Sequence, residues 1–133
     1  MNAIHVLAAL VAAGTLVPAG ASAQQAGITR HDLLRADLSA PGREVLQVLV
    51  EFAPGAVAPA HSHPGEEIVY LVRGSLEYRV EGRPPVILRA GDVLFIPAEA
   101  VHRVTNVGSD VGAELATYVV ERGKALSRMR PEP

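Results

Sequence analysis

Cysteine is absent from this chain of 133 residues. Its absence excludes disulfide cross-links, thiol catalysis and cysteine-ligated zinc sites together. Lysine is nearly absent as well, because Lys124 stands alone beside arginines that are scattered along the chain. The formal net charge is −2, so the chain lacks the positive field that attracts nucleic acid. We therefore expect no nucleic-acid partner.

Long hydrophobic runs are confined to the N-terminus. Residues 4–17 are almost wholly apolar, and Ala21-Ser22-Ala23 follows, as is typical of a signal-peptidase site. The run is shorter than the roughly 20 residues of a membrane-spanning helix. We predict that residues 1–23 are a signal peptide, that the mature protein is periplasmic, and that it keeps no membrane attachment. The residues before the run contain no lysine or arginine, so a different start codon is the alternative.

Long amphipathic helices are also missing. From Arg43 onward the sequence consists of short apolar runs separated by many of the ten prolines and twelve glycines. The runs that we predict to be strands are 45–52, 56–63, 67–73, 76–80, 86–89, 93–96, 101–105 and 113–120. About eight short strands with frequent turns predict an all-β sandwich or barrel.

The expected domain organisation follows from this pattern. Residues 24–42 are predicted to be an N-terminal lead-in, with 33–38 forming an edge strand or a short turn of helix. Residues 43–122 are predicted to form one barrel domain, and 123–133 a disordered tail. About 110 residues remain after cleavage, enough to bury an adequate core without covalent cross-links.

Three histidines and a glutamate carry the candidate chemistry. His61, His63 and Glu67 share strand parity, so their side chains are expected on one face, whereas Glu66 is expected to face solvent or the entrance. His102 is the third histidine. Three imidazoles and one carboxylate suit iron, manganese, nickel, copper or zinc. We predict one divalent transition metal per chain on these four side chains.

Two stretches of sequence place these residues in a wider pattern that resembles the cupin family. The first family motif, Gly-x5-His-x-His-x3-Glu-x6-Gly, is matched at Gly55, His61, His63, Glu67 and Gly74. The second motif, Gly-x5-Pro-x-Gly-x2-His-x3-Asn, is matched at Gly91, Pro97, His102 and Asn106. The departure is Glu99, which stands where the family usually has glycine. The resemblance covers roughly residues 43–120.

The resemblance implies a jelly-roll β-barrel (a double-stranded β-helix) that holds one metal on the four residues named above. It also points to a homodimer. Residues 68–72 and 93–96 support this, because they are apolar on both strand faces and would otherwise expose an apolar surface.

The function expected from the resemblance is a small metal-dependent dioxygenase acting on an oxygen-chelating small molecule. Glu67 would then serve as both ligand and catalytic base, as in flavonol-type dioxygenase cupins. The alternatives are a metal-dependent lyase or isomerase that works through an enolate, and a non-catalytic module that binds a metal or a small molecule.

Several other residues have competing interpretations. Glu99 implies a relaxed turn near the cavity rim and is either a solvated carboxylate or one that repels anionic substrates or serves as a base. Asn106 is expected to tie a turn near Gly108. His31 is expected at the surface. The three tyrosines are expected in the core or at an interface, with a role as catalytic acids as the alternative. They are Tyr70, Tyr78 and Tyr118.

Overall fold

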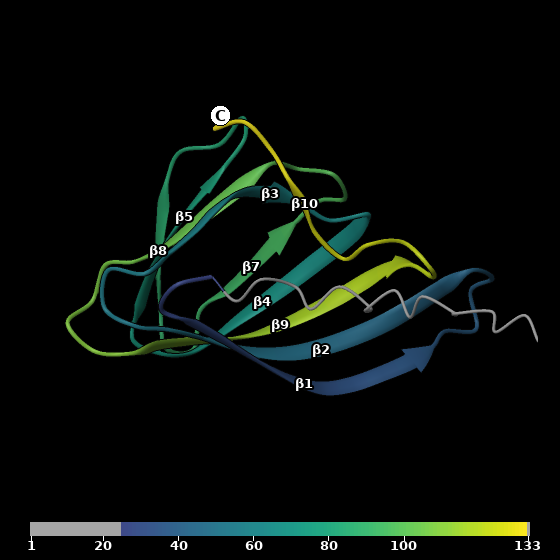
Figure 1. Ribbon diagram of the computed structural model, residues 1–133, viewed down its shortest axis with the longest axis horizontal. Helices are drawn as coiled ribbons and strands as arrows, with labels where there is room; N and C mark the ends of the chain where they lie inside the picture. Colours follow the sequence, from purple (N-terminus) through teal and green to yellow (C-terminus); the bar gives the residue numbers. More distant parts are fainter. Residues whose placement is uncertain (1–24, 133) are drawn as a thin grey trace, which may run out of the picture.

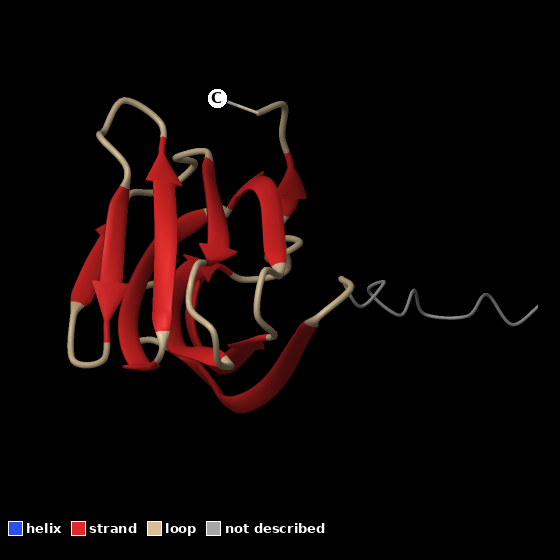
Figure 2. Cartoon of the chain, turned by 90° about the vertical axis from the view of Figure 1, so that its left-hand side faces the viewer, coloured by secondary structure: helices blue, strands red, loops and turns tan. Residues whose placement is uncertain are grey.

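The computed structural model describes residues 25–132, so the predicted signal peptide lies outside the described residues. Within that range the regular structure is entirely β (Figures 1 and 2). No helix in it is long and apolar enough to cross a membrane. The strands are β1 (Ile28–Asp37), β2 (Arg43–Phe52), β3 (Val57–Ser62), β4 (Gly65–Arg73), β5 (Ser75–Val80), β6 (Val86–Arg89), β7 (Val93–Ile96), β8 (His102–Asn106), β9 (Gly112–Glu121) and β10 (Arg128–Met129).

The strands form two antiparallel sheets that face each other (Figure 1). One has the order β1-β2-β9-β4-β7 and the other β10-β3-β8-β5-β6. Strands that are distant in sequence lie side by side in both sheets, which is the topology of a jelly roll. The predicted fold class is confirmed.

Alternation along the strands places the core between the sheets. On β9, Ala116, Tyr118 and Val120 are buried, while the residues between them are half-buried. On β4, Val69 and Leu71 are buried, and the intervening residues are exposed. Because side chains alternate across a strand, each sheet turns one apolar row inward. The largest side chains of this core are Tyr78, Tyr118, Phe52, Leu71 and Leu76.

Both ends of the described chain are more ordered than the sequence suggests. β1 begins at Ile28, inside the predicted lead-in, and pairs with β2 along its length. The prediction of a disordered tail is wrong for the residues described, because β10 pairs with β3. The physical reason is that Leu126 packs against the core and brings the following residues to the edge of β3. A two-residue strand after a short, partly charged stretch leaves no periodic signal in a sequence.

Candidate metal centre

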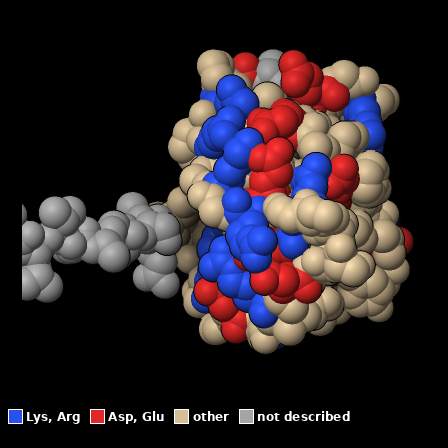
Figure 3. Space-filling view, turned by 90° about the vertical axis from the view of Figure 1, so that its right-hand side faces the viewer, with Lys and Arg blue, Asp and Glu red and all other residues tan. Residues whose placement is uncertain are grey.

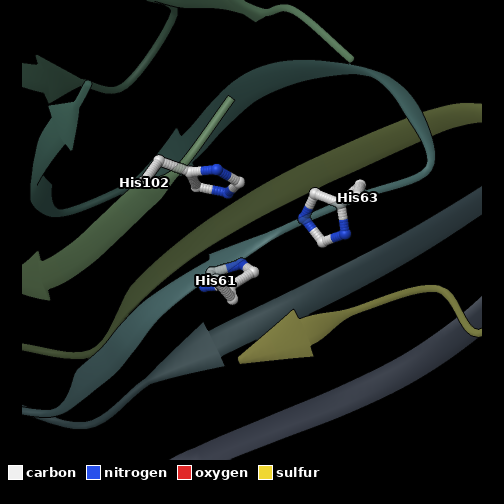
Figure 4. A group of neighbouring side chains, drawn as sticks. All are labelled: His61, His63 and His102. Atoms are coloured by element: carbon white, nitrogen blue, oxygen red, sulfur yellow. The ribbon is translucent and has the colours of Figure 1, made fainter. Parts of the chain in front are cut away.

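The three histidines of the motifs lie together on the sheet that contains β3 and β8. His61 and His102 are direct cross-strand partners, with ring centroids 4.2 Å apart. His63 follows the end of β3, and its ring lies 4.9 Å from that of His61. Figure 4 shows the three imidazoles around a common space. None is more than 6% exposed. The prediction that alternate residues bring His61 and His63 together therefore agrees with the fold.

Glu67 reaches the same space from the opposite sheet. Its Oε2 atom lies 3.2 Å from Nε2 of His63 and 3.2 Å from Nε2 of His102. β4 begins at Gly65, where a β carbon would collide with the carbonyl oxygen of Val119 on β9. Glycine thus lets β4 approach β9 closely just before Glu67. As parity predicts, Glu67 is buried, whereas the neighbouring Glu66 is half-buried on the other face.

A backbone carbonyl fixes each imidazole at Nδ1. The Nδ1 atoms of His61 and His102 contact the carbonyl oxygens of Pro59 and Ala100 at 2.7 Å and 3.0 Å. Nδ1 of His63 contacts the Leu126 carbonyl at 2.7 Å. Because a carbonyl oxygen only accepts, each Nδ1 must carry the proton and donate it. In each ring Nε2 is then the nitrogen left to face the space between the three histidines, where it can bind a metal.

The unpaired atoms of this cluster fit a metal ion. One donor atom from each of the three histidines lies within 4.8 Å of the others. Among the described residues, the buried Nε2 of His63 and Oε2 of Glu67 have no hydrogen-bond partner. Their 3.2 Å contact is short enough for an ion pair but lacks hydrogen-bond direction. Leaving buried polar atoms unpaired costs about 1–3 kcal/mol each, and a shared cation would remove that cost.

The electrostatics of the cluster keep the donors in their metal-binding forms. Burial, followed by repulsion from His102, lowers the pKa of His61 to about 4. Burial tends to raise the pKa of Glu67, but polar contacts with His102 and His63 outweigh it, so the pKa lies well below its usual range. At neutral pH, His61 is therefore neutral and Glu67 ionised, as metal ligation requires.

Sequence reasoning missed a second group of polar residues inside the barrel. Glu114 on β9 is buried and accepts a hydrogen bond from the Tyr78 hydroxyl. Burial and then the charge of Glu67 raise the pKa of Glu114 well above its usual range. The same two causes raise the pKa of Tyr118, whose ring centroid lies 4.8 Å from that of His63. The parity that Glu114 shares with Tyr118 along β9 is the signal that could have found it.

Glu99 does not relax its turn, which corrects the expectation from the sequence. Its φ is 62°, the left-handed conformation that glycine adopts readily. In a residue with a β carbon this conformation costs about 1–2 kcal/mol. The backbone N–H of Glu99 donates to the carbonyl of His63 at 3.0 Å, which ties the turn to the histidine.

Two residues have the structural roles expected from the sequence. The Asn106 side chain donates to the carbonyls of Phe52 and Asp110, and its Oδ1 accepts from the Gly108 N–H at 2.9 Å. Asn106 therefore ties the turn after β8, as predicted. His31 lies at the surface and contacts Glu51 at 3.2 Å.

Residues 48–124, more than half of the chain, match the sequence profile of the cupin domain. This chain belongs to the cupin family. Dimethylsulfoniopropionate lyase DddQ of Ruegeria pomeroyi is 40% identical to it over 58 residues, which are 43% of this chain and 29% of the lyase. Polyketide synthase CurC of Streptomyces cyaneus is 43% identical over 58 residues, 43% of this chain and 37% of CurC. The matches thus span about a third of the length of these relatives.

Solved structures place this cupin among similar barrels. The crystal structure of DddQ from Ruegeria pomeroyi superposes with a TM-score of 0.58 at 28% identity, covering 64% of this chain and 42% of the lyase. A protein with a double-stranded β-helix domain from Klebsiella pneumoniae superposes with a TM-score of 0.64 at 21% identity, covering 82% and 89%. The second likeness concerns the fold alone.

Proposed function

We propose that this cupin is a metal-dependent lyase that removes a proton from a small, oxygen-bearing substrate. One observation carries the proposal. Glu67 is held ionised beside His63 and His102, while Glu114, bonded to the Tyr78 hydroxyl inside the same barrel, is held protonated by its raised pKa. Neighbouring titratable groups whose pKa values are pushed apart are a mark of acid–base chemistry. The match to a dimethylsulfoniopropionate lyase supports the same reaction class.

The proposed ligands of the metal are the four residues that converge: His61, His63, Glu67 and His102. Three imidazoles and one carboxylate suit first-row divalent ions such as iron, manganese, nickel, copper or zinc. When bound, such an ion supplies a Lewis acid that polarises a carbonyl or carboxylate oxygen of the substrate. Buried apolar residues around the site exclude water, which strengthens these electrostatic interactions.

In the proposed reaction, Glu67 accepts the proton from the carbon next to the polarised carboxylate or carbonyl. The electron pair of the broken C–H bond becomes the new C=C bond, and the leaving group on the adjacent carbon departs with its bonding pair. Glu114, protonated and bonded to the Tyr78 hydroxyl, is the candidate acid that would donate its proton to a leaving group that departs as an anion. No oxidant enters this balance.

An isomerase would return the proton to a different carbon, and the dioxygenase expected from the resemblance would consume oxygen. A panel of carboxylates with a leaving group on the β carbon, including dimethylsulfoniopropionate, separates these outcomes. In heavy water without oxygen, the zinc-, iron- or manganese-loaded lyase should form an unsaturated product and release the leaving group, with the substrate's α proton passing to the solvent, whereas an isomerase should place deuterium on a different carbon. With the same substrates in air, oxygen consumed in step with substrate would instead establish the dioxygenase. A protein that binds these small molecules but catalyses none of the three reactions would be a non-catalytic binding module.

The substrate partner is therefore proposed to be a small molecule, and the protein partner a second copy of this chain. The outward face of β4 and β7 is apolar, and five of its side chains are 37–62% exposed. The strands present them in register, with Ile68 beside Phe95 and Tyr70 beside Val93. A symmetric dimer that covers this face would bury an apolar patch that a soluble monomer rarely exposes. The five residues of this dimer face are Ile68, Tyr70, Val72, Val93 and Phe95.

Phe95→Glu should convert the dimer into a monomer, because it places a charge within the apolar face. Sedimentation velocity measures the change, and Leu33→Glu on β1 is the matched control, since Leu33 is exposed but lies away from the dimer face. A wild-type monomer, or a Phe95→Glu dimer, would contradict this assignment.

Export is proposed from residues 1–23 alone. The mature protein should then begin at Gln24 and be found in the periplasm. Intact-mass measurement on the periplasmic fraction of an expressing cell should give the mass of a chain that starts at Gln24. A cytoplasmic protein that retains Met1 would refute the proposal.

A further inference from the structure

The residues that follow β9 lie beside the three histidines. We call residues 122–130 the C-terminal strap. It leaves the end of β9, turns back, and lies along the edge of β3, where Arg128 and Met129 pair with Ser62 and His61 (Figure 1, yellow). The strap therefore lies beside the strand that contains His61 and leads into His63.

One contact joins the strap directly to a proposed ligand. The carbonyl of Leu126 accepts the Nδ1 proton of His63 at 2.7 Å, while the Leu126 side chain packs against the core. The corresponding carbonyls for His61 and His102 belong to residues two positions away in sequence. The Leu126 carbonyl lies 63 residues away, so the orientation of His63 depends on the strap staying in place.

Arg130 holds the strap to the barrel through three contacts. Its backbone N–H donates to the carbonyl of Ala60 at 2.9 Å. Its guanidinium donates to Ser62 Oγ at 3.0 Å and to Glu99 Oε2 at 3.3 Å. We call Arg130, Glu99 and Ser62 the latch. Ser62 is fully buried, so one end of the latch is anchored inside the protein.

The latch gives a reason for a glutamate at position 99, where the family motif has glycine. The residue adopts a left-handed conformation, in which glycine would be unstrained, and its carboxylate is the acidic partner of Arg130. The same residue donates its backbone N–H to the His63 carbonyl. The turn that departs from the family motif therefore contacts both His63 and the residue that fastens the strap.

We propose that the C-terminal strap is a positioning element of the metal centre, in which Leu126 orients His63 and the Arg130–Glu99–Ser62 latch holds Leu126 in place. The inference rests on the proposed metal site for its effect on affinity, but its effect on His63 exists without metal. Partners that orient a ligating imidazole commonly change metal affinity by about 10- to 100-fold.

The attraction between Arg130 and Glu99 should weaken as the salt concentration rises. Figure 3 views the end of the barrel from which the strap starts, and shows Lys and Arg in a band beside Asp and Glu. Arg130 and Glu99 are partly exposed, so dissolved ions screen their attraction. Lys124 and Arg122 on the strap are paired with Glu121 and Asp37, respectively.

The test uses the full chain and compares Arg130→Ala with Arg122→Ala. Arg122 lies on the same strap and pairs with Asp37 at 2.8 Å, outside the latch. In the metal-free protein, nitrogen-15 NMR of the imidazoles should show wild-type His63 with its proton on Nδ1. Arg130→Ala should give a mixture of tautomers and about 10-fold weaker zinc binding. Arg122→Ala should change neither, and Arg130→Lys should restore part of both.

Glu99→Gly provides the second variant, because it removes the acidic partner while relieving the left-handed strain. It should reproduce the NMR change of Arg130→Ala without unfolding the protein. The double variant should be no worse than either single one, since both open the same latch. Unchanged His63 tautomers and unchanged zinc affinity in Arg130→Ala would overturn the proposal. Should the wild type bind no zinc while Arg130→Ala still alters the His63 tautomer, the metal assignment fails and the strap's role stands.

Discussion

His102→Ala should weaken binding of a divalent transition metal by at least about 100-fold and abolish turnover. Losing a hydrogen-bond partner of a ligand costs up to about 100-fold, and His102 is itself a proposed ligand. Its Nε2 lies 3.2 Å from Glu67 Oε2, so its loss also removes a neighbour that keeps Glu67 ionised. Isothermal titration calorimetry with zinc measures the loss of affinity.

The control for this prediction is His31→Ala. His31 is an exposed histidine on β1 that contacts only Glu51 among the described side chains. This control shows whether removing a histidine outside the proposed site also weakens zinc binding. We expect no change in affinity. Because His102 is almost fully buried, unfolding of the metal-free variant should be measured in parallel. A folded His102→Ala protein that binds zinc like the wild type would remove His102 from the site.

Glu67→Gln should separate metal binding from turnover. The amide keeps the shape of the side chain and one oxygen for the metal, so metal content should fall only in part. It has no basic carboxylate, so turnover should fall by about 100- to 10,000-fold, the usual contribution of general acid–base catalysis. Elemental analysis and single-turnover rates on the same sample make the comparison.

The matched variant for Glu67→Gln is Glu66→Gln. Glu66 lies on the other face of β4 and is half-buried, so its amide should leave both readings unchanged. An equal loss of metal and turnover in Glu67→Gln would make Glu67 a ligand only. The proton acceptor would then have to come from the Glu114 and Tyr118 side of the barrel.

The part of the site that was predictable is the part set by local spacing. His61, His63 and Glu67 share a face because strand parity is a property of neighbouring residues. The two motifs then place His102 on the adjacent strand. The burial of Glu67 and the outward direction of Glu66 follow from the same rule.

What could not be predicted depends on contacts between distant segments. The carbonyl of Leu126 has no signature in sequence, since every residue carries a carbonyl group. Its contact with His63 emerges only when β10 pairs with β3. Parity along β9 could indicate that Glu114 faces inward, but its hydrogen-bond partner Tyr78 lies in the other sheet and emerges only from the fold. Glu99 was expected to relax its turn, whereas the ion pair with Arg130 accompanies a left-handed backbone.

X-ray absorption spectroscopy of the protein, purified without a histidine tag and without added metal, tests the central claim most directly. The absorption edge identifies the element, and the fine structure counts imidazole ligands. We expect one first-row transition metal per chain, bound by three imidazoles and one carboxylate. A protein that contains no such metal and takes none up, or a metal whose ligands include no imidazole, would contradict the assignment of His61, His63, Glu67 and His102.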